Sequence, residues 1–317
     1  MVRGHIKALD GALKEDKVMK TWAAISFITG TVLVVASVVV ANVQGFDLMD
    51  EIHNLISVES VQVEKEIDVT VAKRIVVRAD NEEVKIVGVS QAVDTGWDDV
   101  VVRKSPDVIR VNYSQPTNGR WGYDVRLEGD ELIVERWSEE VFMQIFPWFV
   151  TGLKPVLIEI PMGLMVDIDV ETSNASVSAK SLSAQDIKLH TSNGAVRVND
   201  VEANLLDLRS SNGAIELKAV VAKGIVAKTN NGVIRLDRVK ADSIEGKSSN
   251  GAIIGLIGGL RDEFSIKVNT SNGKVVINGK EKGKSYDEGD GTKMIKLETS
   301  NGWIRLDFSD DEIKDEE

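Results

Sequence analysis

The sequence predicts an all-β protein, a β-solenoid (β-helix-like) of about 19-residue rungs, preceded by one N-terminal transmembrane α-helix. Two observations support this prediction. The N-terminal part of the chain contains 26 consecutive uncharged residues, and the C-terminal half repeats an Asn-containing motif at a regular spacing.

The composition indicates a folded, acidic chain without cysteine chemistry. Of its 317 residues, 43% are hydrophobic and 28% are charged, which is sufficient for a buried core. The absence of Cys excludes disulfide scaffolds, thiolate catalysis and Cys-based metal sites. The formal net charge of −12 argues against nucleic acid as the main partner, because the phosphate backbone binds basic surfaces.

Residues 21–46 are the predicted membrane anchor. At about 1.5 Å per residue, a helix of this length spans a hydrocarbon core of about 30 Å with some tilt. The basic residues that closely precede it are Lys14, Lys17 and Lys20. Because basic flanks stay on the cytoplasmic side, we expect residues 1–20 to be cytoplasmic and the bulk of the chain extracytoplasmic. The alternative is a cleaved signal peptide, with Val39 and Ala41 at its cleavage site.

The segment after the anchor is predicted to lead into the solenoid. We expect residues 47–66 to be a linker and residues 67–165 to be an irregular β cap, because strand-like runs begin at Ile67. The apolar stretch 141–150 is too short to span a bilayer and is expected to cover the first rung. Alternatively, it contacts the membrane or a partner through its aromatic side chains. These are Phe142, Phe146, Trp148 and Phe149.

Residues 166–309 are predicted to form the solenoid, because Asn residues recur there at separations of 19, 19, 19, 19, 22 and 29 residues. They are Asn174, Asn193, Asn212, Asn231, Asn250, Asn272 and Asn301. The apolar pairs of one copy are Val196/Val198, Val201/Ala203 and Leu206/Leu208. Their period of two is typical of strands, and copies stacked about 4.8 Å apart can close a core that one copy cannot. The alternative is an antiparallel meander, since Asn-Gly is also a hairpin signal.

Most copies place the Asn within Ser-Asn-Gly, which predicts a corner of the rung. We expect Asn and Gly to adopt positive φ at these corners, and the stacked amides to bond from rung to rung. The insertion 279–291 in the last copy is expected to loop out. The acidic tail 310–317 is expected to remain solvated and to discourage further stacking.

The motif Gly-Leu-x-x-Asp-Ile-Asp-Val at 163–170, followed by Thr-Ser-Asn-Gly repeats, resembles a bacterial and archaeal adhesin-type family with β-strand repeats, a domain of unknown function. The resemblance covers roughly residues 67–309. It implies a β-repeat architecture and an adhesive role. Because some relatives occur beside envelope-stress signalling systems, it also implies a sensor or regulator role as an alternative. The family offers no catalytic motif.

The sequence lacks the motifs of common enzyme chemistry. Its histidines are His5, His53 and His190. The first two fall in the predicted cytoplasmic segment and beside the membrane, so only one is left to activate a nucleophile. No nucleophile elbow, phosphate-binding loop, zinc-protease motif or dinucleotide motif is present. We therefore expect no catalytic residue, no metal site and no cofactor, and a carbohydrate-active β-helix enzyme is kept only as a third alternative.

One outward position of the repeat carries basic or potentially basic residues. They are His190, Arg209, Lys228 and Lys247. Because equal positions stack, these groups are expected to form a column in which they repel one another. Two interpretations are open: a ladder that binds an anionic envelope polymer, or a solvated edge compensated by nearby acidic groups. At another position, Arg197, Glu216 and Arg235 alternate in sign, which predicts a stabilising ladder.

Together these features predict a membrane-anchored extracytoplasmic β-solenoid that acts as a cell-envelope binding, adhesion or structural module. The alternative is an accessory sensor or regulator of envelope-stress signalling. The expected partners are the membrane, an anionic envelope polysaccharide or a membrane signalling protein, and a second copy through the solenoid ends.

Overall fold

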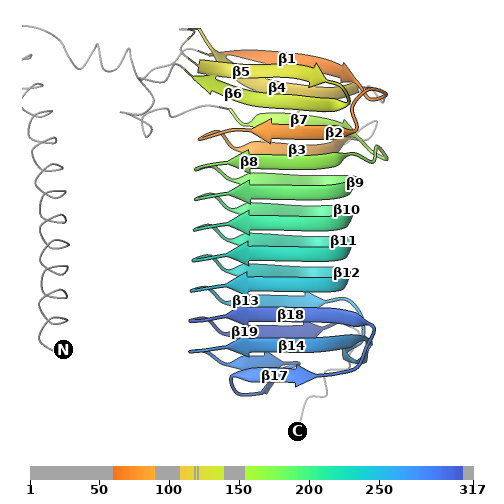
Figure 1. The fold of residues 1–317 in the computed structure, drawn as a ribbon, viewed down its shortest axis with the longest axis vertical. Helices are drawn as coiled ribbons and strands as arrows, with labels where there is room; N and C mark the ends of the chain where they lie inside the picture. Colours follow the sequence, from red (N-terminus) through yellow and green to blue (C-terminus); the bar gives the residue numbers. More distant parts are fainter. Residues whose placement is uncertain (1–59, 90–107, 118, 120, 139–153, 310–317) are drawn as a thin grey trace, which may run out of the picture. The chain divides into compact units, whose positions relative to one another are not determined.

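The computed structural model describes the following residues: 60–89, 108–117, 119, 121–138 and 154–309. They form strands and turns (Figure 1), and the one helix among them is the 3₁₀ turn η1 (Arg261–Glu263). Within these ranges no helix has the length and apolarity needed to cross a bilayer. Several predicted segments lie outside the described residues: 1–20, 21–46, most of the linker 47–66, the apolar stretch 141–150 and the tail 310–317.

Four long strands form the regular part of the stack. They are β9 (Val177–Thr191), β10 (Val196–Ser210), β11 (Ile215–Thr229) and β12 (Ile234–Ser248). Each pairs in parallel with the next in a 19-residue register, so that Val196 lies opposite Val177 on one side and Ile215 on the other. This pairing confirms the all-β, solenoid-like architecture and excludes a meander, whose neighbouring strands would be antiparallel.

Each regular rung has three sides, because its ladder is interrupted at two positions. In β10 the pairing skips Asp200 and Asn204, which separates a first side (196–199), a second side (201–203) and a third side (205–210). The predicted apolar pairs point inward: Val196, Leu206 and Leu208 are fully buried, and the other members are at most 7% exposed. The strand period of two therefore encodes the core correctly.

Positive φ occurs at the first bend of the rung and not at the Ser-Asn-Gly corner. Ser181, Asp200, Ala219 and Arg238 have φ between 52° and 56°, whereas no Asn or Gly of the described Ser-Asn-Gly corners has positive φ. The expectation for the corners was therefore wrong. Gly is required there because the rungs approach closely: a Cβ on Gly213 would lie 1.8 Å from the carbonyl oxygen of Gly194.

The N-terminal end of the stack does not follow the order of the chain. Strand β2 (Arg74–Arg78) lies between β6 (Glu131–Ser138) and β8 (Asp167–Thr172), in parallel with both. Likewise, β3 (Val84–Val89) lies between β7 (Val156–Pro161) and β9. The rung β2–β3 is therefore inserted between strands that come later in the sequence (Figure 1).

Antiparallel strands complete this end. They are β1 (Ser60–Asp68), β4 (Val108–Pro116) and β5 (Trp121–Glu128). Strand β4 pairs with both β1 and β7, and β5 pairs with β6. Two boundaries are thereby corrected. The linker expected over 47–66 overlaps β1 from Ser60 onward; β1 alternates Val61, Val63 and Ile67, but it is mostly exposed and a charged residue, Lys65, interrupts the pattern. The expected irregular cap contains the regular rung β2–β3, whose partners are distant in sequence.

The C-terminal end is interleaved in the same way. Its parallel strands are β13 (Ile253–Ile257), β14 (Phe264–Thr270), β15 (Val275–Ile277), β18 (Lys293–Thr299) and β19 (Ile304–Phe308). Strand β18 pairs with β12 and β14, while β19 pairs with β13 and β15. The last repeat of the sequence, β18–β19, therefore lies within the stack. The preceding repeat, β14–β15, forms the outer rung at the C-terminal end.

The insertion 279–291 covers this end of the stack. Strand β16 (Lys280–Glu281) is antiparallel to β15, and β17 (Ser285–Glu288) is antiparallel to β14. The expectation that the insertion simply loops out was wrong. Its strands pair with backbone N–H and C=O groups that a terminal rung would otherwise leave open.

Candidate functional site

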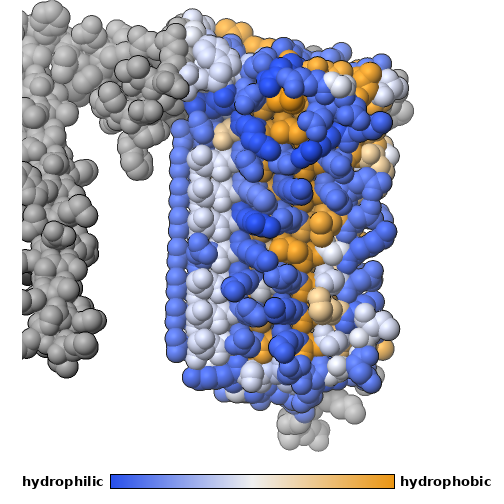
Figure 2. Space-filling view, in the orientation of Figure 1, coloured by the Kyte–Doolittle hydropathy of each residue, from blue (hydrophilic) through white to orange (hydrophobic). Residues whose placement is uncertain are grey.

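The corner asparagines form one continuous hydrogen-bonded column, which we call the Asn ladder. In spatial order it consists of Asn81, Asn174, Asn193, Asn212, Asn231, Asn250, Asn301 and Asn272. From Asn174 onward, each Nδ2 donates to the Oδ1 of the neighbour nearer the N-terminal end, at 2.6–2.7 Å. All the bonds have the same direction. Figure 2 shows a straight hydrophilic column along the edge where the turns lie in Figure 1.

Two members of the ladder differ from the sequence-based expectation. Asn81 was missed, because its corner reads Asp80-Asn81-Glu82 and lacks the Gly of the other copies. Asn301 lies between Asn250 and Asn272, because β18 and β19 are inserted there. The spacing of 29 residues therefore reflects two things: extra residues in the chain, and a last rung that is inserted between two earlier ones.

A second column, of buried hydroxyl groups, runs beside the Asn ladder. Its members are Thr172, Thr191, Ser210, Thr229, Ser248, Thr270 and Thr299. Thr229 Oγ1 donates to the Gly213 carbonyl oxygen of the preceding rung (3.0 Å) and accepts from the Gly232 N–H of its own corner (3.1 Å). The same two bonds recur in four other rungs. The sequence carried this signal as an invariable Thr or Ser before Ser-Asn or Asn-Asn.

The predicted basic column lies on the third side of the rungs. Arg209 is directly opposite His190 and Lys228, and Lys228 is opposite Lys247. The column continues into a carboxylate at each end, because Glu171 is opposite His190 and Glu298 is opposite Lys247. The structure therefore brings all four predicted residues together.

Acidic side chains on the same side pair with this column. Arg209 donates two hydrogen bonds to Asp207, both of 2.8 Å, and these bonds raise the pKa of the guanidinium. Lys228 Nζ lies 2.8 Å from Glu245, and Lys247 Nζ lies 3.5 Å from Glu298. His190 Nε2 is 3.5 Å from Asp207, a contact that is ionic only when the imidazole is protonated. The column thus belongs to a mixed-charge surface, in which each exposed pair contributes about 0–1 kcal/mol.

The alternating column on the first side is also ion-paired. Glu216 accepts from Arg235 at 3.0 Å and lies 3.5 Å from Arg197. Because the three residues are stacked directly, one carboxylate links two cations across three rungs.

A buried charged cluster near the N-terminal end was not predicted. The side chains of Glu82 and Arg136 are 2% and 4% exposed and are 3.2 Å apart, and Arg136 also donates to Asp80 at 2.7 Å. Tyr123 donates to Glu82 at 3.0 Å. Burial, and to a smaller extent the charge of this carboxylate, raises the pKa of Tyr123 well above its usual range. Arg136 lies 5.0 Å from the ring centroid of Trp121. Such clusters are costly to break, which gives this one a structural role.

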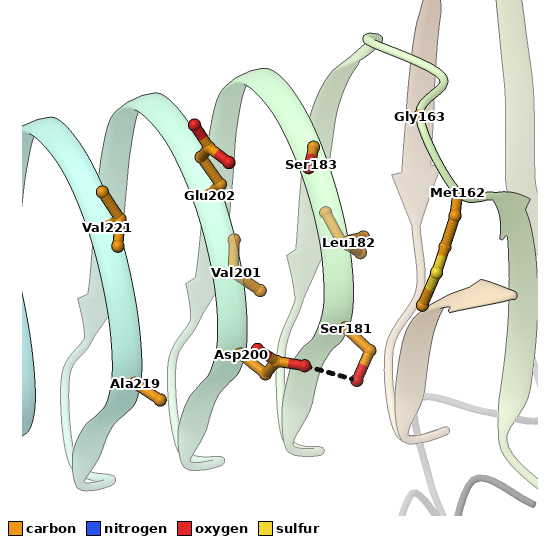
Figure 3. Close-up of a pocket in the computed structure, with 10 residues that line it drawn as sticks. All are labelled: Met162, Gly163, Ser181, Leu182, Ser183, Asp200, Val201, Glu202, Ala219 and Val221. Atoms are coloured by element: carbon orange, nitrogen blue, oxygen red, sulfur yellow. Dashed lines mark hydrogen bonds between the residues drawn. The ribbon is translucent and has the colours of Figure 1, made fainter. Parts of the chain in front are cut away.

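A shallow groove of about 300 Å³ lies on the second side (Figure 3). Its lining comes from successive rungs and from the turn after β7, and includes Met162, Leu182, Val201 and Val221. Ser181 donates to Asp200 across two rungs at 3.2 Å. Among the residues that the structure describes, no group of three or more His, Asp or Glu side chains is placed to hold a metal ion.

The predicted aromatic patch cannot be placed on this surface. Its members, Phe142, Phe146, Trp148 and Phe149, lie outside the described residues.

Parallel rungs with a corner ladder define a solenoid-like repeat protein. A family model described as Toastrack DUF4097 matches residues 92–313, which is more than two thirds of the chain. The chain therefore belongs to the Toastrack DUF4097 family, and the predicted resemblance to an adhesin-type domain of unknown function is confirmed. No curated protein matches the chain.

Several solved structures resemble the chain at low sequence identity. One described as a "putative adhesin" from Bacteroides fragilis has 13% identity and a TM-score of 0.46, and covers 78% of this chain and 97% of its own. A "putative adhesin" from Parabacteroides merdae has 11% identity and a TM-score of 0.40, covering 77% and 95%. A "putative cell adhesion protein" from Clostridium sporogenes has 12% identity and a TM-score of 0.36, covering 79% and 100%.

Proposed function

We propose that this protein is a non-catalytic module of the cell envelope, anchored by residues 21–46, whose β-solenoid lies outside the membrane and binds or spaces envelope components. The observation that supports this most directly is the unbroken Asn ladder. It links eight rungs in one register, and both ends of the stack are covered by antiparallel strands. Such a scaffold offers its sides, rather than its ends, for contact.

The third side is the proposed contact surface. It presents cations and carboxylates at the spacing of the rungs, about 4.8 Å. An anionic polymer with regularly spaced charges would replace the carboxylates as partners of Arg209, Lys228 and Lys247. Because this exchange is electrostatic and solvent-exposed, binding is expected to weaken as salt increases.

The test measures retention of the detergent-solubilised full chain on immobilised polygalacturonate, an anionic polysaccharide, with uncharged dextran as the reference. The test variant carries Arg209→Ser, Lys228→Ser and Lys247→Ser. The matched control carries Lys218→Ser, Lys223→Ser and Lys240→Ser, which removes the same charge from exposed positions away from the third side.

Salt-sensitive retention of the wild type and the control, together with its loss in the test variant, would support polymer binding by the third side. Equal loss of retention in both variants would mean that retention depends on net charge and not on the third side. If isolated envelope also failed to co-sediment with the wild type, the adhesive role would be wrong. A chain without residues 1–20 that still binds would separate adhesion from a signalling role of the cytoplasmic segment.

A further inference from the structure

The described residues contain seven Asn-Gly pairs in two different settings. Six lie at Ser-Asn-Gly or Asn-Asn-Gly corners of the Asn ladder, and the seventh, Asn278-Gly279, forms the turn between β15 and β16. Asn-Gly is chemically labile. The deprotonated backbone nitrogen of Gly attacks Cγ of Asn, a succinimide ring forms and ammonia leaves. Water then opens the ring at either carbonyl, which yields aspartate or isoaspartate.

The Asn ladder opposes this reaction at both reacting groups. The Gly N–H of five corners donates to a buried hydroxyl at 2.8–3.1 Å, and the sixth, Gly302, is buried. The attacked amide is held by its ladder neighbours through Nδ2, Oδ1 or both. Cγ can reach the Gly nitrogen only after these bonds break, and the close stacking of the corners resists the required movement.

The turn at Asn278 holds the amide, since Asn278 Oδ1 accepts from the Phe308 N–H, but it does not pack Gly279 against another rung. Asn278 and Gly279 have φ of 45° and 73°, Gly279 is exposed, and apart from its chain neighbours no residue lies within 4 Å of the position that a Cβ on Gly279 would take. A two-residue turn at the end of the stack can open by breaking the bonds of Asn278 to β19, without disturbing the Asn ladder. Such local openings cost much less free energy than global unfolding.

We propose that Asn278 is a site of spontaneous deamidation, and that the six corner pairs are protected by the stack. The site has a structural consequence. The N–H of Asn278 donates to the Leu306 carbonyl oxygen at 2.9 Å, and Asn278 Oδ1 accepts from the Phe308 N–H at 3.0 Å. Isoaspartate adds a methylene to the backbone, which moves the donor and the acceptor of these two hydrogen bonds out of line. The reaction therefore loosens β19, the strand inserted within the C-terminal stack.

The test incubates the purified full chain in mildly alkaline buffer and measures deamidation by peptide mass spectrometry, with and without urea. In the native protein, Asn278 is expected to react about tenfold or more faster than any corner Asn, since local opening is cheap there. In urea the seven pairs should react at similar rates. Native corner asparagines that react as fast as Asn278 would overturn the proposal.

A pair of variants tests the protection itself. Thr229→Val removes the hydroxyl that holds the Gly232 N–H, whereas Thr229→Ser keeps it. Deamidation of Asn231 should rise in the Val variant alone. If that variant does not fold, hydrogen exchange of the aged wild type still tests the effect on β19. Exchange in 304–308 should increase with the isoaspartate content at Asn278. Unchanged exchange would contradict the loosening of β19.

Discussion

At the scale of single residues, the corner assigns a separate physical role to each position. The buried Thr or Ser satisfies one backbone group of its own rung and one of the preceding rung. The Asn bonds to its neighbours through its side chain, and the Gly allows the backbones to approach. Because all three roles depend on the adjacent rung, stacking rather than intrinsic turn preference selects these residues.

The single direction of the Asn ladder makes its members unequal. In Asn231→Asp, a carboxylate oxygen replaces the Nδ2 that donates to Asn212, and faces another acceptor. We expect a loss of about 1–2 kcal/mol of unfolding free energy. In Asn81→Asp, the oxygen that accepts from Asn174 is kept, so stability should remain near wild type. Urea unfolding of both variants measures this difference, and equal losses would contradict a directional ladder.

Asp169 predicts a pH dependence. Burial opposes ionisation of this carboxyl group, but hydrogen bonds and charge from Arg78 and Arg74 outweigh it and lower the pKa of Asp169. A lowered folded-state pKa stabilises the fold above the unfolded value of about 3.9, and this contribution disappears as the pH falls through the folded value. Asp169→Asn should therefore be destabilised at neutral pH, and the difference from wild type should shrink in acid.

The control for this titration is Asp287→Asn, which removes a carboxylate that is 70% exposed beside Lys267. Thermal unfolding across the acid range should show little difference between this variant and wild type. A difference for Asp169→Asn that stayed constant down to strongly acidic pH would contradict the ion-pair explanation.

At the scale of elements, a rung is inserted out of chain order near each end of the stack. The rung β2–β3 enters the N-terminal end, and the rung β18–β19 enters the C-terminal end. Each inserted rung has parallel partners above and below, so the chain ties distant segments together. The outer strands β14 and β15 consequently depend on strands that are synthesised after them.

This dependence can be tested by truncation. A chain that stops after Thr292 lacks β18 and β19, and β14 and β15 thereby lose their parallel partners. Hydrogen exchange should become fast in 264–277 although these residues are present. A chain that stops after Ser309 keeps both partners and should show wild-type protection there. Full protection of 264–277 in the shorter chain would mean that this rung can stack directly on β12 and β13.

At the scale of the molecule, the regular part of the stack is modular. Strands β9 to β12 share one register, and their rungs repeat the inward positions, the hydroxyl and the Asn, with Gly246 as the one inward position that has no side chain. Stability in such a repeat is close to a sum of rung and interface contributions. The module can therefore change in length without changing its sides, which is consistent with the proposed spacing or binding role.

If the regular part of the stack is modular, one whole rung can be removed without loss of the fold. Deletion of residues 213–231 joins Asn212 to Gly232 and restores an intact Ser-Asn-Gly corner in register. This variant should fold cooperatively with a moderately lower melting temperature. Deletion of 213–230 or 213–232 shifts every later side chain by one position and should abolish cooperative melting, because a one-residue slip turns the apolar face outward. Similar melting of all three would contradict a strict register.

The sequence by itself determined the rung length, the inward residues, the alignment of His190 with Arg209, Lys228 and Lys247, and the family. These features are local or strictly periodic, so the spacing along the chain carries them directly. The tertiary structure decided the rest. It placed Asn81 and Asn301 in the ladder, moved positive φ to Asp200 and its equivalents, and surrounded the basic column with carboxylates. These outcomes depend on contacts between distant segments, because two inserted rungs and the closeness of neighbouring backbones are set only when the stack forms.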